Sequence, residues 1–503
     1  MNQEVPFYTV SHYIHGKTHT VTGEEKHAIT HPATGKIIGE TYLANTKTLD
    51  AAVNSAKKAF SEWADTPPLK RARILFHFKE LLQKNKASLA ALVSREHGKT
   101  LDDAAGSIDR GIELIEFMCS APYLLRGTFS ENAGSHIDCY TIRQPLGICA
   151  GISPFNFPVM VPLWMMIPAI ACGNTFILKP SEQDPSAPLK LAELLTEAGL
   201  PEGVINIING DKSIVEQVLC HPDIKAVTAV ASTPVAKHIY KTAIANGKRS
   251  HTFGGAKNHC IVMPDADLDI AADAIAGAAF GAAGERCMAI SAVVAVGDTT
   301  ADKLIEKITQ KIEQLHIGPG DKPNVDMGPL ISRTHREKVM NYIELGIQEG
   351  AQLVVDGRKT VFPEHPEGFF LGASLFDKVQ PHMRIYQEEI FGPVLCLIRA
   401  ANFEEGLALI NHHIYGNGTA IFTQNGETAR TFANKVQAGM VGINIPIPVP
   451  VTFHPFGGWK SSLFGDLGMH GDQSIQFYTQ TKTVTVKWPH TSHANSSYIM
   501  PND

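Results

Sequence analysis

The chain of 503 residues lacks the features that mark several specialised classes of protein. Its eight cysteines form no Cys-x-x-Cys pair, which argues against a disulfide framework or a cysteine zinc site. The most apolar segment, residues 157–172, contains three prolines, so the chain has no uninterrupted apolar run long enough to span a membrane. A net charge of −6 without a long basic run disfavours nucleic acid as a partner. These absences predict a globular protein with no metal, membrane or nucleic-acid partner.

The composition is otherwise ordinary, with 44% hydrophobic and 19% charged residues. This length predicts two or more domains, each large enough to bury a core. Residues 1–6 carry neither the apolar region of a signal peptide nor the arginine-rich bias of a transit peptide. Because the cysteines show no sign of pairing, a reducing cytoplasm is the expected location.

The periodicity of apolar residues predicts an α/β organisation. Helical spacing covers residues 49–63 and 69–82, and a third helix is predicted from Asp102 to Phe117. Further along, apolar strands alternate with helices such as 186–198, which predicts a parallel sheet covered on both faces. The expected strands are 147–152, 175–178, 204–208, 226–230, 260–263 and 291–296, and a second alternating region extends from about 289 to 441.

The C-terminal segment from Ser474 to Trp488 is rich in aromatic and β-branched residues, which predicts a strand. A strand so far from the rest of the pattern needs a partner. Residues 137–144, with Tyr140 and Ile142, are a candidate, in a sheet that two subunits could share.

Cys287 is the strongest candidate for a catalytic residue. An isolated cysteine is most often a small buried hydrophobe. Here, however, a predicted helix, Leu268–Phe280, leads into a turn of glycines and alanines that leaves room for a substrate or a flat cofactor. Arg286 directly precedes the thiol and is expected to stabilise the thiolate, the form that attacks a carbonyl carbon. The sequence therefore predicts a nucleophilic thiol.

The common dinucleotide fingerprint Gly-x-Gly-x-x-Gly is absent after the first predicted strand. Two weaker features stand in its place. Lys179 and Glu182 follow a strand, where they could hold the hydroxyls of a sugar, although a solvated turn has the same composition. Ser232 begins a helix whose hydroxyl-capped N-terminus could bind phosphate, as every capped helix could.

Three further segments suggest a site. Pro154–Pro158 fixes Asn156 between prolines and aromatics, so that its amide could donate to an oxyanion; a turn asparagine is the ordinary alternative. Glu388 and Glu389 precede an aromatic turn. One of them could be a general base or a sugar ligand, and a surface acidic pair is the ordinary alternative. Thr252–Asn258 is a glycine-containing strand end that would allow close approach of a ligand.

Taken together, these motifs resemble the aldehyde dehydrogenase superfamily, in that family's order and over nearly the whole chain. The segments that carry the resemblance are 154–158, 179–182, 253–255, 284–287, 389–394 and 455–458. The segments 255–259, 281–289, 442–450 and 476–482 are most similar to its CoA-acylating, methylmalonate-semialdehyde branch.

The resemblance implies two doubly wound α/β domains and a small β arm for oligomerisation. The implied NAD-binding domain comprises residues 1–123 and 144–252, and the implied catalytic domain residues 253–470. The arm would comprise residues 124–143 and 471–503, and it implies a homodimer or a homotetramer.

The resemblance also implies the roles of individual residues. Cys287 is the nucleophile, and Asn156 forms the oxyanion hole with the Cys287 backbone N–H. Arg110 and Arg286 occupy the positions that bind the substrate carboxylate, for which the guanidinium fork is suited. The positions that match the NAD site are Ser153, Phe155, Lys179, Glu182, Gln183, Ser232, Glu389 and Phe391.

Thr252 stands where hydrolytic members of the family carry a glutamate that activates water. Threonine is no base at neutral pH, so the resemblance implies that CoA accepts the acyl group. The implied reaction oxidises methylmalonate or malonate semialdehyde to propionyl-CoA or acetyl-CoA, with NAD as oxidant and loss of CO2. A hydrolytic dehydrogenase with another base is one alternative. A binding protein without activity is the other, because Ala229, Ala231 and Gln183 depart from the family's cofactor motifs.

Overall fold

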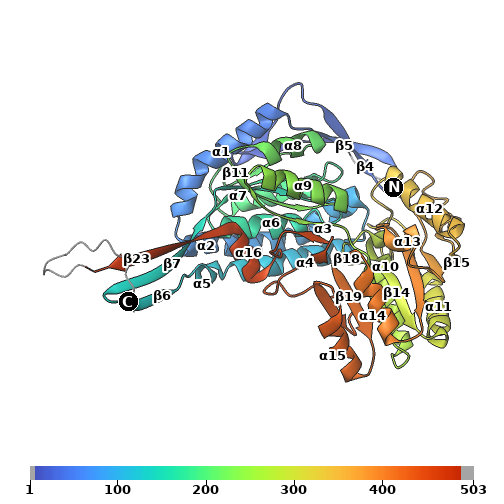
Figure 1. The fold of residues 1–503 in the computed structure, drawn as a ribbon. Helices are drawn as coiled ribbons and strands as arrows, with labels where there is room; N and C mark the ends of the chain where they lie inside the picture. The colour runs from blue at the N-terminus through green and yellow to red at the C-terminus, as the bar shows by residue number, and fades with distance from the viewer. Residues whose placement is uncertain (1–5, 489–503) are drawn as a thin grey trace.

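The computed structural model describes residues 6–488, which form two large sheets covered by helices (Figure 1). The first sheet has eight strands, and its central strands are parallel. In spatial order they are β22 (Leu463–Phe464), β12 (Arg249–Phe253), β11 (Ile224–Val230), β8 (Ile148–Ile152), β9 (Thr175–Lys179), β10 (Ile205–Ile207), β2 (His12–Ile14) and β3 (Lys17–His19).

Helices pack on both faces of this sheet, because the side chains of its strands alternate between two apolar clusters. Ile148 and Ala150 of β8 face one layer, and Cys149 faces the other. The first layer is formed by α1 (Thr46–Asp65), α8 (Lys212–Cys220) and α9 (Thr233–Ala245). The second is formed by α2 (Pro68–Lys84), α3 (Lys86–His97), α4 (Leu101–Met118), α6 (Met160–Ala171) and α7 (Ser186–Glu197).

The second sheet has seven strands and is also covered on two sides. In order they are β15 (Gln352–Val355), β16 (Ser374–Asp377), β17 (Val394–Ala400), β14 (Ile290–Val296), β13 (Asn258–Val262), β19 (Gly418–Phe422) and β20 (Met440–Ile443). The covering helices are α10 (Leu268–Phe280), α11 (Asp298–Glu313) and α12 (Arg333–Gln348) on one side, and α14 (Phe403–His412) and α15 (Gly426–Lys435) on the other. The predicted α/β class is confirmed, and the predicted strands are found within two residues of their expected ends.

Three strands form an arm that projects from the body of the molecule (Figure 1). They are β6 (Phe129–Gly134), β7 (Ile137–Pro145) and β23 (Thr479–Lys487). β23 pairs antiparallel with β7 along its whole length, from Thr479 opposite Pro145 to Lys487 opposite Ile137. The predicted pairing of the C-terminal strand with residues 137–144 is therefore confirmed, within one chain.

The predicted start of that strand at Ser474 is wrong. Residues Gly471–Tyr478 form the helix α16, in which Ile475, Phe477 and Tyr478 are buried. The Phe477 ring stacks on His251 at 3.6 Å between ring centroids. Packing of these aromatic side chains against the body of the molecule outweighs their preference for strands. Residues 489–503 of the predicted arm lie outside the described part of the chain.

A small sheet of three strands near the N-terminus was not predicted from the sequence. It consists of β1 (Tyr8–Val10), β4 (Lys26–His31) and β5 (Lys36–Tyr42). Short connecting elements are α5 (Ala121–Leu124), α13 (Arg384–Gln387), β18 (Tyr415–Gly416) and β21 (Trp459–Lys460). Within residues 6–488, no helix combines the length and the apolar character needed to cross a membrane.

Candidate active site

Cys287 lies in a tightly held loop between α10 and β14. Ala282 and Ala283 adopt left-handed backbone conformations, with φ of 50° and 53°, and turn the chain sharply. The Cys287 carbonyl accepts hydrogen bonds from the side-chain amides of Asn258 at 2.9 Å and Asn417 at 3.0 Å. Backbone strain and two amide donors therefore fix the position of the thiol.

Two pockets meet at Cys287. The larger, of about 350 Å³, includes both predicted carboxylate-binding arginines, Arg110 and Arg286. The smaller, of about 20 Å³, lies on the other side of the thiol and includes Glu389 and Phe391. We call them the substrate pocket and the cofactor-side pocket. The other residues that line the substrate pocket include Phe157, Met160, Trp164, Ile447, Val449 and Phe456.

Burial raises the pKa of the Cys287 thiol to about 12, and the nearby Glu389 carboxylate raises it further. The backbone N–H groups of Cys287 and Met288 and the ammonium of Lys99 act in the opposite direction. The guanidinium of Arg286, which was predicted to stabilise the thiolate, donates a hydrogen bond to Asp103, and its effect on the thiol stays a prediction. Arg286, the neighbour of Cys287 in the sequence, is thus engaged by Asp103. Lys99, which is distant in the sequence, lowers the pKa of the thiol.

Lys99 connects the arginine to the predicted oxyanion hole. Its side chain is buried between α3 and α4, and Nζ donates to the backbone carbonyl of Asn156 at 2.7 Å. The ammonium also lies 3.3 Å from Asp103 and 4.2 Å from the centre of the Phe157 ring. Although burial opposes its ionisation, Lys99 and Arg286 lower the pKa of Asp103 to about 2. Asp103 therefore carries a charge shared by two cations.

Asn156 lies in the loop after β8, where the two prolines and Phe157 hold it. Its side-chain Nδ2 donates to the carbonyl of Glu285 at 3.0 Å, two residues before Cys287. An amide nitrogen has a second N–H to offer. The structure thus places the predicted oxyanion donor directly against the loop that carries the thiol.

Arg110 extends from α4 into the substrate pocket, where its guanidinium pairs with Glu113 at 2.8 Å. Its side chain is 39% exposed, whereas that of Arg286 is 21% exposed. The two arginines therefore differ, since one is held by an interior carboxylate and the other by a carboxylate near solvent.

Most of the predicted cofactor residues lie at or just after the ends of β8, β9 and β11. Lys179 at the end of β9 pairs with Glu182 at 2.8 Å. Within residues 6–488, the buried Ser153 hydroxyl and the Gln183 amide oxygen have no hydrogen-bond partner. Ser232 precedes α9, but the predicted cap is wrong because its hydroxyl does not bond to the N–H groups of the helix. These polar atoms lie where a bound dinucleotide would supply their partners.

Glu389 and Phe391 define the cofactor-side pocket. Glu389 accepts a hydrogen bond from the Ala256 N–H at 2.8 Å, and burial raises the pKa of its carboxyl group. A Cβ atom at Gly255 would lie 2.5 Å from the same carboxylate, so glycine is needed there. Phe391 has a φ of 60°, and its ring meets that of Phe155 edge-on at 5.9 Å. Hydrogen-bond acceptors and donors, together with a glycine that leaves space for a ligand, therefore fit NAD.

Thr252 is fully buried at the end of β12. Its hydroxyl donates to the Ala236 carbonyl of α9 at 2.9 Å. The position that the resemblance assigns to the water-activating base thus holds a hydroxyl that is already used inside the protein. The substrate pocket does contain two carboxylates, Asp102 and Asp103, and the second of these is occupied by its cations.

Sequence reasoning missed a buried polar cluster beside the site. Glu285 is fully buried, with a pKa raised by burial, and its carboxylate lies 3.5 Å from His335 and 4.0 Å from His97. His335 also lies 2.6 Å from the carbonyl of Phe391. Lys99 was missed as well. No sequence signal marks Lys99 or Glu285, because a lysine before a helix and a glutamate before an arginine are both typical of solvated turns.

The fold is that of an aldehyde dehydrogenase, and the chain belongs to the aldehyde dehydrogenase family. The family model matches residues 19–484. A malonate-semialdehyde dehydrogenase of Pseudomonas aeruginosa is 52% identical over 98% of this chain and 99% of its own.

Two solved structures are similar over nearly their whole length. A protein of Sinorhizobium meliloti, described as a methylmalonate-semialdehyde dehydrogenase in complex with NAD, is 54% identical with a TM-score of 0.96, covering 97% of this chain and 99% of its own. A methylmalonate-semialdehyde dehydrogenase of Oceanimonas doudoroffii is 53% identical with a TM-score of 0.95, covering 96% and 99%.

Proposed function

We propose that this protein oxidises malonate semialdehyde or methylmalonate semialdehyde to acetyl-CoA or propionyl-CoA, with NAD as oxidant and loss of CO2. The observation that carries the proposal is a single pocket that unites Cys287 with two arginines. Thr252, at the position of the family's water-activating base, is engaged by the Ala236 carbonyl. The names of the similar proteins support the same substrates.

Cys287 is the nucleophile of this reaction. Its thiolate attacks the aldehyde carbon, and the carbonyl oxygen becomes an oxyanion that the Asn156 amide and the Cys287 N–H stabilise. Five residues, Lys179, Glu182, Ser153, Ser232 and Glu389, would hold NAD, which would accept the hydride that leaves this carbon. What remains on the enzyme is a thioester of Cys287.

The two arginines bind the substrate carboxylate. Their planar guanidinium groups suit a carboxylate, and the surrounding pocket wall is otherwise largely apolar. Binding of the carboxylate by the arginines directs the aldehyde end of either semialdehyde toward the thiol. Once the thioester has formed, the carbon–carboxylate bond breaks, CO2 leaves, and the electron pair is protonated on carbon.

CoA completes the cycle. Its thiolate attacks the thioester carbonyl, and Cys287 leaves as a thiolate. Thr252 leaves water without a base at the position that the family uses for hydrolysis. The alternative of a protein without activity is disfavoured, because Cys287 and both arginines line one pocket.

We also propose that the protein is a cytoplasmic homodimer or homotetramer. The projecting arm of β6, β7 and β23 supports assembly, because a three-stranded sheet away from the body leaves its edges and faces available to another subunit (Figure 1).

The first experiment is NADH formation from malonate semialdehyde and NAD, with and without CoA. We expect a stoichiometric burst without CoA and steady turnover to acetyl-CoA only with it. Cys287→Ala is the control and should abolish both. Steady turnover to free acid without CoA would instead indicate a hydrolytic enzyme, with Asp102 as the first residue to test as its base.

A further inference from the structure

The side chain of Glu285 is fully buried two residues before Cys287, and the reaction described above gives it no role. Its Oε1 accepts a hydrogen bond from the Ile331 N–H at 3.2 Å, in the segment that leads into α12. Within residues 6–488 this is the only hydrogen bond of the carboxyl group, although His335 and His97 lie 3.5 and 4.0 Å from it. The carboxyl group therefore ties the loop that carries Cys287 to the chain before α12.

The backbone of Glu285 bonds to the residue that we assign to the oxyanion hole. Its carbonyl accepts a hydrogen bond from Asn156 Nδ2 at 3.0 Å. A side-chain amide is planar and has two N–H donors, so a bond made by the first fixes the direction of the second. The direction in which Asn156 can donate to an oxyanion therefore depends on the position of the Glu285 carbonyl.

The chain before Glu285 does not hold this position by its own preferences. Ala282, Ala283 and Gly284 have positive φ angles of 50°, 53° and 72°, and the left-handed conformation is costly for alanine. Such a segment persists only when its surroundings hold it. The N–H of Glu285 bonds to the Ala282 carbonyl at 3.0 Å, within the loop. The bond from Ile331 to the Glu285 side chain comes from outside the loop and fixes it in the protein.

Glu285 does not itself contact the reacting groups. It is not among the described residues that line the substrate pocket or the cofactor-side pocket. Burial raises the pKa of its carboxyl group well above the ordinary range, which favours the neutral acid over the carboxylate that a general base requires. A contribution of Glu285 to the reaction therefore passes through its neighbours.

We propose that Glu285 is a positioning residue for the oxyanion hole. Its side chain anchors the loop at Ile331, and its backbone carbonyl then directs the second N–H of Asn156 toward the oxygen of the aldehyde. This role rests on the function proposed above, in which Asn156 stabilises the oxyanion. It predicts that changes at Glu285 affect catalysis only while Asn156 is present.

The test compares Glu285→Met with Glu285→Gln, two side chains of similar length of which only glutamine can accept the bond from Ile331. The rate of the NADH burst is measured without CoA, at saturating NAD and malonate semialdehyde. We expect Glu285→Met to lower this rate about tenfold or more, because a misplaced donor stabilises the transition state less, and Glu285→Gln to recover most of it. In the Asn156→Ala background, Glu285→Met should have no further effect.

A second reaction of the thiol separates positioning of Asn156 from general damage to the loop. Alkylation of Cys287 by iodoacetamide forms no oxyanion, so its rate in Glu285→Met should stay within about twofold of that of the unaltered enzyme. The matched control is Glu24→Met, which removes a side chain that is equally buried but bonds to His12 of β2, near the edge of the first sheet opposite to β12. Its burst rate should equal that of the unaltered enzyme.

Several results would overturn the role of Glu285. They are an unchanged burst rate in Glu285→Met, an equally slow burst in Glu285→Gln or Glu24→Met, an equal loss of the burst and alkylation rates, and a further loss when Glu285→Met is added to Asn156→Ala. If Glu285→Met does not fold, Glu285→Ala gives the same comparison with glutamine. An unaltered enzyme without a burst, or a full burst rate in Asn156→Ala, would instead contradict the proposed function, whatever the result at Glu285.

Discussion

Lys99 illustrates how a single buried charge organises several catalytic groups. It bonds to the Asn156 carbonyl, pairs with Asp103 and opposes the rise of the Cys287 pKa that burial causes. Asp103 in turn binds Arg286. Asn156, Cys287 and Arg286, to which we assign catalytic and binding roles above, are thus linked through Lys99 and Asp103, and we propose Lys99 as a positioning residue for all three.

Lys99→Met should slow acylation while retaining much of the packing of the lysine stem. Without the cation the pKa of the Cys287 thiol rises further, and Asn156 loses the bond that holds its backbone. We expect the rate of the NADH burst to fall about tenfold or more, and alkylation of Cys287 by iodoacetamide to shift to higher pH.

Lys86→Met is the control for this change, because Lys86 begins α3 and pairs with Asp109 near the surface. The same burst rate and the same pH profile of alkylation in Lys99→Met and the unaltered enzyme would contradict the role of Lys99.

At the scale of an element, the turn between α10 and β14 determines where the thiol points. Two consecutive alanines in the left-handed conformation each cost about 1 kcal/mol or more, relative to glycine. Gly284 follows with a φ of 72°, and a Cβ atom there would collide with the Gly392 carbonyl. The turn is therefore held by its contacts rather than by its own preferences.

Ala282→Val should disturb this turn, because a β-branched residue tolerates the left-handed conformation poorly and the position is buried. We expect a loss of about 1–3 kcal/mol in the free energy of unfolding, together with a slower burst. Thermal unfolding and burst kinetics measure the two effects. Ala282→Gly tests the backbone argument, since glycine adopts this conformation freely, and a loss of stability as large as that of valine would contradict it.

The elements also show where sequence patterns succeed. The strands β8, β9, β11, β13 and β14 each contain a run of apolar residues, because both faces of a parallel sheet are buried, and such runs are visible in the sequence. The N-terminal strands are short and half-exposed, so their pattern is weak. The aromatic residues of α16 suggested a strand because aromatic residues prefer strands locally. Their packing against the body of the molecule, which makes the segment helical, is not visible in the sequence.

At the scale of the whole molecule, buried histidines make stability depend on pH. Burial lowers the pKa of His251 and His470 to about 3 and that of His413 to about 4, below the ordinary value of about 6.5. Between pH 6.5 and 4 the unfolded chain binds protons at these positions and the folded protein does not. The contribution of these histidines to the free energy of unfolding is therefore largest above pH 6.5. It decreases as the pH falls, by up to about 1.4 kcal/mol per pH unit for each histidine.

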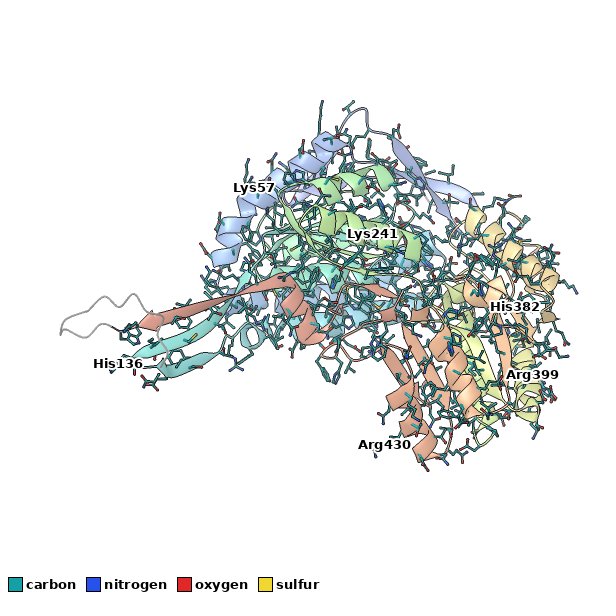
Figure 2. All side chains as sticks on the ribbon, viewed as in Figure 1. Lys57, His136, Lys241, His382, Arg399 and Arg430 are labelled. Atoms are coloured by element: carbon teal, nitrogen blue, oxygen red, sulfur yellow. The ribbon has the colours of Figure 1, made fainter. Side chains whose placement is uncertain are left out.

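His251→Gln should make this decrease shallower. The variant lowers by one the difference in bound protons between the unfolded and folded states. Glutamine can still donate to the Leu467 carbonyl, which lies 3.0 Å from the His251 ring. Urea denaturation from pH 7 to pH 4 measures the slope. His382→Gln, at an exposed position labelled in Figure 2, is the control and should leave the slope unchanged. Equal slopes for His251→Gln and the unaltered protein would contradict the assignment.

The sequence by itself determined the α/β class and the family, because each depends on local runs of residues or short motifs. The nucleophilic cysteine and the residues of its site are predictions that rest on the same motifs. Only the tertiary structure decided which charges act together. Arg286 is next to Cys287 in the chain and yet bonds to Asp103, while Lys99, distant in sequence, acts on the thiol. The reason is physical: electrostatic effects depend on distance in space and on burial, and both arise when α3, α4 and the Cys287 loop pack together.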